Sequence, residues 1–158
     1  MKREEKLMKE AIDLSQKALA EKNEGGPFGC IVVKDGKIIG RGHNKVIDNN
    51  DPTAHAEIVA IREACKNLGT FQLDDCEIYT SCEPCPMCLG AIYWARPKIV
   101  YYANTRADAA TIGFDDSMIY SEMNVSLADR KIPMQNICRI DANKIFKKWV
   151  DKNDKRLY

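Results

Sequence analysis

The sequence predicts an α/β fold with three layers, in which one central sheet carries helices on both faces. Two observations predict it. Segments with apolar residues at helical spacing alternate with short runs of β-branched and aromatic residues, and Gly- or Pro-containing turns separate them. The length, 158 residues, suffices for one domain with a buried core. We therefore expect a single domain over residues 1–158.

The elements follow from periodicity and from helix-end signals. Asp51 and Pro52 are the residue types expected at an N-cap and at the first helical position, and Gly69 at a helix end. In chain order, the pattern predicts a helix over 3–22, strands over 28–33 and 38–40, a helix over 52–68, a strand over 76–80, a helix over 86–94, a strand over 98–102, short helices over 106–110 and 117–123, a weak strand over 135–140 and a closing helix over 142–151. The sheet should thus have about five strands.

Charge and cysteine usage limit the classes of partner. The formal net charge is +1, so no polyanion-binding surface is expected. No run reaches roughly 18 apolar residues, and the first residues lack a secretory hydrophobic segment. Seven scattered cysteines are typical of a reducing compartment. We expect a cytoplasmic protein that acts on a small molecule, with no nucleic-acid or membrane partner.

Two short stretches contain residue types that bind zinc. Cys85 and Cys88 lie three positions apart at the start of an expected helix, so their thiols project to one side, and the helix N-terminus favours thiolates. His55 supplies a third ligand of a type that zinc prefers. Three protein ligands leave a position for water, whose pKa zinc lowers to about 7. Glu57, two residues from His55, can then move protons.

Other interpretations of the cysteines are open at this stage. With Cys82 as a fourth ligand, the site would be closed and purely structural. The three clustered cysteines could alternatively help to hold an iron–sulfur cluster. Pro84 argues against both, because it keeps Cys82 off the helical face that Cys85 and Cys88 share. Neither alternative uses Glu57.

The order of these residues matches a known signature. Residues 55–57 followed by 84–88 match the H-x-E…P-C-x-x-C pattern of zinc nucleobase deaminases. More narrowly, nearly the whole chain resembles the bacterial guanine deaminase branch of the cytidine deaminase superfamily. The resemblance is carried by residues 25–29, 49–57, 80–97 and 113–117. It implies a cytidine-deaminase-like α/β/α fold with a mixed sheet and one zinc ion per chain.

The resemblance also implies an activity and a set of site residues. The reaction is hydrolysis of guanine, a purine base, to xanthine and ammonia, with attack of the activated water at C2. Glu57 carries the proton to a ring nitrogen, and Asp116 is a second proton carrier. The implied substrate-binding residues are Phe28, Asn44, Ala56, Trp94 and Tyr158. The implied assembly is a homodimer that exchanges residues 141–158, so that Tyr158 closes the partner's site.

Several alternatives share the metal ligands. A tRNA adenosine deaminase has the same zinc ligands but must bind an anionic stem-loop. The balanced charge of this chain disfavours such a substrate. Deaminases of guanosine, cytosine or another base or nucleoside differ only in what the pocket admits. A further alternative is a binding protein instead of an enzyme, namely a zinc-stabilised module without turnover. This alternative predicts no role for Glu57.

Overall fold

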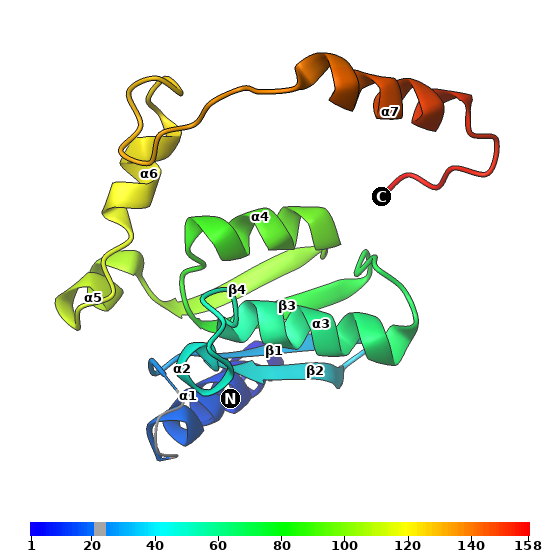
Figure 1. Cartoon of the computed structure of the whole chain (residues 1–158). Coiled ribbons are helices and arrows are strands. Elements are labelled where there is room, and N and C mark those ends of the chain that lie inside the picture. Colours follow the sequence, from blue (N-terminus) through cyan, green and yellow to red (C-terminus); the bar gives the residue numbers. More distant parts are fainter. Residues whose placement is uncertain (21–24) are drawn as a thin grey trace. The chain divides into compact units, whose positions relative to one another are not determined.

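The computed structural model describes residues 1–20 and 25–158, which form two compact units, Met1–Asp116 and Ser117–Tyr158. The larger unit holds a sheet between helices (Figure 1). Among the described residues, no helix combines the length and apolar character needed to cross a membrane. The predicted end of the first helix, at residue 22, lies outside the described residues.

The sheet has four strands in the order β2-β1-β3-β4. The bounds are β1 Gly29–Lys34, β2 Lys37–His43, β3 Cys76–Cys82 and β4 Ile99–Asn104. β1 pairs antiparallel with β2 and β3, whereas β3 pairs parallel with β4, so the sheet is mixed. The predicted hairpin is confirmed. Asp35 and Gly36 both have positive φ, 48° and 75°, as a two-residue turn between right-twisted strands requires.

Helix α1 (Arg3–Ala20) covers one face of the sheet. Its buried Ala11 packs with Ile31, Val33 and Tyr79, which point to that face because strand side chains alternate. The contact is close at Gly29, where a Cβ would lie 2.2 Å from the carbonyl oxygen of Ala11.

Helices α3 (Ala56–Leu68) and α4 (Pro86–Ala95) cover the other face. The core between them and the sheet consists of Cys30, Val32, Ala56, Ala60, Ala64, Leu73, Cys76, Ile78, Ile92 and Ala95. Small alanines along α3 let the helix lie close to the strands. The predicted three-layer α/β arrangement is therefore confirmed, with helices on both faces (Figure 1).

The predicted start of the second long helix was wrong. α3 begins at Ala56, with His55 as its N-cap, instead of at residue 52. Asp51 accepts hydrogen bonds from the backbone N–H of Thr53 at 2.8 Å and from its hydroxyl at 2.6 Å, so it closes a turn. A short helix that the sequence did not predict, α2 (Val46–Asn49), precedes this turn.

The remaining helices are α5 (Arg106–Thr111), α6 (Ser117–Met123) and α7 (Arg139–Asp151). The strand predicted over 135–140 is wrong: these residues form no strand, and the sheet in the described part of the chain has four strands instead of five. The reason is local. Cys138 has a left-handed φ of 54° at the N-cap of α7, which interrupts an extended chain, and the helix starts three residues before the predicted 142.

Candidate metal centre

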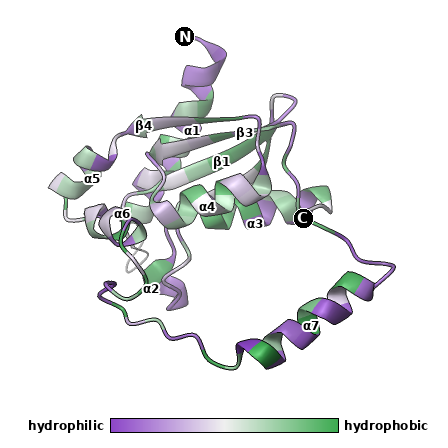
Figure 2. Ribbon diagram, turned by 90° about the horizontal axis from the view of Figure 1, so that it is seen from above, coloured by the Kyte–Doolittle hydropathy of each residue, from purple (hydrophilic) through white to green (hydrophobic). Residues whose placement is uncertain are grey.

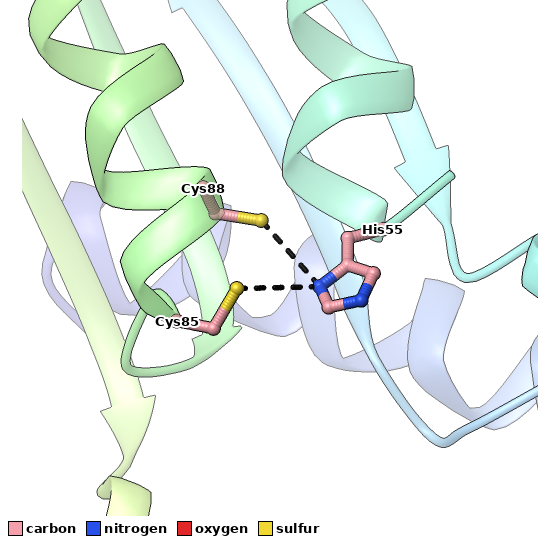
Figure 3. A group of neighbouring side chains, drawn as sticks. All are labelled: His55, Cys85 and Cys88. Carbon is pink, nitrogen blue, oxygen red and sulfur yellow. Dashed lines mark hydrogen bonds between the residues drawn. The ribbon is translucent and has the colours of Figure 1, made fainter. Parts of the chain in front are cut away.

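Three predicted ligands converge where the N-termini of α3 and α4 meet. His55 is the N-cap of α3, Cys85 is the N-cap of α4, and Cys88 lies in the first turn of α4. The His55 Nδ1 atom lies 3.5 Å from the Cys85 Sγ and 3.6 Å from the Cys88 Sγ. Figure 3 shows the three side chains pointing toward one another. Their ligand atoms all lie within 4.8 Å of each other, as the predicted metal site requires.

The geometry of the three atoms fits zinc. With Zn–S near 2.3 Å, Zn–N near 2.05 Å and a tetrahedral angle, an N···S separation of about 3.6 Å is expected. The two separations that involve His55 are 3.5 and 3.6 Å. Two thiols and an imidazole are also the donor types that zinc prefers. The donor types and the two separations from His55 therefore fit a zinc ion.

The electrostatics of the Cys85 thiol favour metal binding. A hydrogen bond from Cys88 lowers the pKa of Cys85 to about 4; burial opposes this shift, and the hydrogen bond with His55 adds to it. The hydrogen bond with Cys85 raises the pKa of His55. Cys85 therefore carries a thiolate at neutral pH, which is the form that binds metal.

Cys82 does not join this group. It is 6% exposed, and its Sγ lies 3.6 Å from the carbonyl oxygen of Thr105. Burial raises its pKa to about 11, so it stays a thiol. Among the described residues, the cluster able to hold a metal contains His55, Cys85 and Cys88 alone. Three ligands leave room for water, unlike the closed four-ligand alternative.

Glu57 lies directly beside the ligand cluster. Its side chain is almost fully buried, with 6% exposed. Its Oε2 accepts from the Cys88 thiol at 3.4 Å, and its Oε1 accepts from the Thr80 hydroxyl at 3.4 Å. Burial raises the pKa of Glu57. A buried carboxyl group whose pKa is raised is suited to accept a proton and return it.

Three further predicted residues lie in the same unit as the cluster. Asn44 is 5% exposed, and its Oδ1 accepts from the backbone N–H of Val46 at 3.1 Å. The ring of Phe28 meets that of Phe114 edge to face, with centroids 4.9 Å apart. Burial raises the pKa of Asp116, and the nearby Cys85 raises it further. This electrostatic coupling connects the Asp116 loop with the metal ligands.

The other predicted substrate-binding residues are spread more widely. Ala56 is fully buried in the first turn of α3, next to His55. Trp94 lies near the C-terminal end of α4, the end opposite Cys85, and is 62% exposed. Tyr158 is 72% exposed and belongs to the second unit, Ser117–Tyr158.

Sequence reasoning missed three residues that support the site. Thr80 contacts Glu57, Phe114 contacts Phe28, and Gly25 lies against Asn44, where a Cβ would be 2.2 Å from Oδ1. All three lie in stretches that carry the family resemblance, 25–29, 80–97 and 113–117, but no site role was predicted for them. Thr80 has a further signal, because it is a polar residue in a strand in which Cys76 and Ile78, the preceding residues on the same face, are apolar.

Comparison with known sequences identifies the family. Residues 1–104, more than half of the chain, match the family model for the cytidine and deoxycytidylate deaminase zinc-binding region. The chain belongs to this deaminase family. The matched region ends at the last residue of β4 and includes all three candidate zinc ligands of the deaminase.

Guanine deaminases are among the proteins most similar to this chain. The deaminase is 52% identical to the guanine deaminase of Bacillus subtilis (strain 168) over 154 residues, 98% of each chain. The crystal structure of guanine deaminase from Bacillus subtilis superposes with a TM-score of 0.94, over 98% of both chains at 52% identity. A guanine deaminase structure from Nitrosomonas europaea gives a TM-score of 0.65 at 34% identity, over 70% of this chain and 63% of that one.

A second group of relatives matches a shorter part of the deaminase. The tRNA-specific adenosine deaminase of Aquifex aeolicus (strain VF5) is 45% identical over 100 residues, 63% of this chain and 65% of that protein.

Proposed function

We propose that this deaminase holds one zinc ion through His55, Cys85 and Cys88, and that Glu57 and Asp116 move protons in its reaction. The chain catalyses the hydrolytic deamination of guanine to xanthine and ammonia. The observation that carries this function is the 52% identity to a guanine deaminase along 98% of both chains.

The proton path starts at Glu57. When bound by these residues, zinc would act as a Lewis acid and would lower the pKa of a water molecule to about 7. Glu57 takes a proton from the attacking water and delivers it to a ring nitrogen of guanine as the C–O bond forms at C2. The raised pKa of Glu57, caused by burial, suits both halves of this transfer.

Asp116 completes the reaction. Departure of ammonia requires a proton on the exocyclic nitrogen as its bond to C2 breaks. Burial and the charge of Cys85 raise the pKa of Asp116, which helps it to hold a proton until the amine leaves. This assignment is supported by the position of Asp116 in the loop that Phe114 anchors on Phe28.

Substrate binding uses the purine's faces and edge. We assign the rings of Phe28 and Trp94 to contacts with the faces of the purine, and Ala56 to a backbone contact beside the metal site. Asn44 binds the edge: its Oδ1 already accepts from Val46, so its NH₂ group is the donor for an acceptor atom of the base.

We propose a homodimer in which residues 141–158 are exchanged and Tyr158 closes the partner's site. The apolar residues of α7 support it. Those more than 40% exposed in this helix are Ile140, Ile145, Phe146, Trp149 and Val150. Figure 2 shows apolar and polar residues along the same helix. An apolar helix face of this kind needs a covering surface. We also propose a cytoplasmic location, which the seven cysteines support because none of them is in a disulfide.

The second candidate substrate is an adenosine in tRNA, which the shorter matches favour. A panel of guanine, guanosine, cytosine and tRNA, followed by ammonia release, separates the candidates. We expect release from guanine, and we expect a chelator to abolish it. Release from guanosine or tRNA but not from guanine would overturn the assignment.

Glu57→Gln tests the role of Glu57. The variant should keep its zinc and its thermal stability but lose about 10²- to 10⁴-fold in rate, the usual contribution of a proton carrier. Glu63→Gln is the matched control on the same helix; Glu63 is exposed and accepts a hydrogen bond from the Arg41 backbone N–H. A zinc-stabilised binding module would instead show no turnover in the wild type.

A further inference from the structure

Thr80 is a buried hydroxyl below the metal site. It lies in β3 and is 1% exposed. A buried hydroxyl is costly unless it is hydrogen-bonded, so its partner indicates what holds it there. The Thr80 Oγ1 donates to the Oε1 of Glu57 at 3.4 Å.

The strand register explains why Thr80 reaches Glu57. Side chains alternate along β3, so Cys76, Ile78 and Thr80 share the face that packs on α3. Cys76 and Ile78 belong to the apolar core there, whereas Tyr79 points to the opposite face with α1. Thr80 follows Ile78 in this row, where the first turn of α3 presents Glu57.

We propose that Thr80 is a positioning residue that holds one carboxylate oxygen of Glu57 and thereby aims the other at the metal ligands. The two oxygens have different surroundings: Oε1 accepts from Thr80, and Oε2 lies 3.4 Å from the Sγ of Cys88. This inference rests on the proposed role of Glu57 as the proton carrier.

Orientation matters because a carboxylate rotates easily about its last torsion, which has broad, roughly two-fold minima. Threonine in a strand has a restricted χ1, so its hydroxyl offers a fixed anchor. A separation of 3.4 Å is longer than the usual O–H···O bond of about 2.7–2.8 Å. Hydrogen bonds in catalytic sites are often long before substrate binds and shorten in the reacting complex.

Thr80→Val keeps the side-chain shape and removes the hydroxyl. We expect kcat for guanine to fall about 10- to 100-fold, the effect of losing a hydrogen bond to a charged group, with KM changed less than about 2-fold. Zinc content should stay at the wild-type level. A crystal structure of the variant should show the Glu57 carboxylate rotated. Thr80→Ser, which keeps a hydroxyl, should have a kcat within about 3-fold of the wild type.

Ser81→Ala is the matched control. Ser81 is the next residue of β3, is 4% exposed, and accepts from the backbone N–H of Gly29 at 2.9 Å. Its removal also deletes a buried hydroxyl, but one that makes no contact with Glu57. We expect a lower melting temperature and a kcat within about 3-fold of the wild type.

The outcomes separate this inference from the proposed function. If Thr80→Val keeps wild-type kcat while Glu57→Gln is inactive, the positioning role of Thr80 is wrong and Glu57 retains its role. If Glu57→Gln is active, the proposed proton carrier is wrong. A loss of kcat that follows loss of zinc, or that Thr80→Ser does not repair, also overturns the inference. If Thr80→Val does not fold, the kcat of Thr80→Ala is compared with that of Thr80→Ser. Equal kcat values in these two variants would contradict the inference.

Discussion

The carboxamide of Asn44 is held by backbone on two sides. Its Oδ1 accepts from the N–H of Val46 at 3.1 Å, and Gly25 approaches the same oxygen so closely that a Cβ there would lie 2.2 Å away. Gly25 also has a φ of +114°, a conformation that residues with side chains rarely adopt. Gly25 therefore determines where the proposed purine-binding amide can lie.

Gly25→Ala should displace Asn44 and raise KM for guanine by about 10-fold, since one hydrogen bond to the base is weakened. Gly36→Ala is the control, because Gly36 also has positive φ, +75°, but its Cβ would meet nothing within 4 Å. Both variants should lose about 1–2 kcal/mol of stability from backbone strain. Steady-state kinetics and thermal melts measure the two effects; equal KM values in both variants would refute the link to Asn44.

Residue spacing alone predicted the three ligands and Glu57, because ligand chemistry restricts which residue types can act together. It did not predict Gly25 or Thr80 as supporting residues. Their contacts with Asn44 and Glu57 depend on how a loop and a strand are placed against elements distant in sequence. Periodicity reveals which face a residue occupies, but it does not reveal which residue lies opposite.

At the scale of elements, one carboxylate attaches α1 to the sheet. Glu77 of β3 accepts from the Tyr79 hydroxyl at 2.7 Å, from Arg3 of α1 at 2.9 Å and from Lys98 at 3.1 Å. Its side chain is 11% exposed. Burial alone would raise the pKa of Glu77, but the hydrogen bonds from Tyr79, Lys98 and Arg3 outweigh burial and lower it.

The lowered pKa of Glu77 determines how its contribution to stability changes with pH. A carboxyl group whose folded pKa lies below the unfolded value of 4.5 stabilises the fold fully above that pH, and this contribution is lost as pH falls through the folded pKa. Glu77→Gln should therefore cost about 1–3 kcal/mol at pH 7 and progressively less below pH 4.5. Thermal melts across pH test this. Glu10→Gln, on the exposed face of α1, is the control, and a pH-independent difference for Glu77→Gln would contradict the prediction.

Two element boundaries show what local signals cannot resolve. Asp51 and Pro52 form a typical helix start, yet Asp51 closes a turn with Thr53, and α3 begins only at Ala56. Residues 135–140 contain β-branched residues but form no strand, because Cys138 adopts a left-handed φ of 54° at the N-cap of α7 and the helix has already begun at Arg139. In both cases the residue types fit the predicted element, but the observed backbone follows a neighbouring turn or helix end.

At the scale of the molecule, the two buried core clusters belong to the unit Met1–Asp116, and α7 belongs to the unit Ser117–Tyr158. The apolar residues of α7 need a covering surface, and either the same chain or a second copy can provide one. Under the proposed exchange, Tyr158 and Glu57 that serve one site come from different chains. Under the alternative, both come from the same chain.

A heterodimer of Glu57→Gln and Tyr158→Ala distinguishes these cases. Each variant alone should be impaired, by about 10²-fold or more for Glu57→Gln and by roughly 10-fold for Tyr158→Ala. If the tails are exchanged, one site of the heterodimer pairs an intact Glu57 with an intact Tyr158, and the other site carries both defects. Heterodimers isolated with two different affinity tags should then regain about half of the wild-type activity. Tails that cover their own chain would give no gain over the average of the two parents, and a monomer would yield no doubly tagged species, so either result would end the exchange proposal.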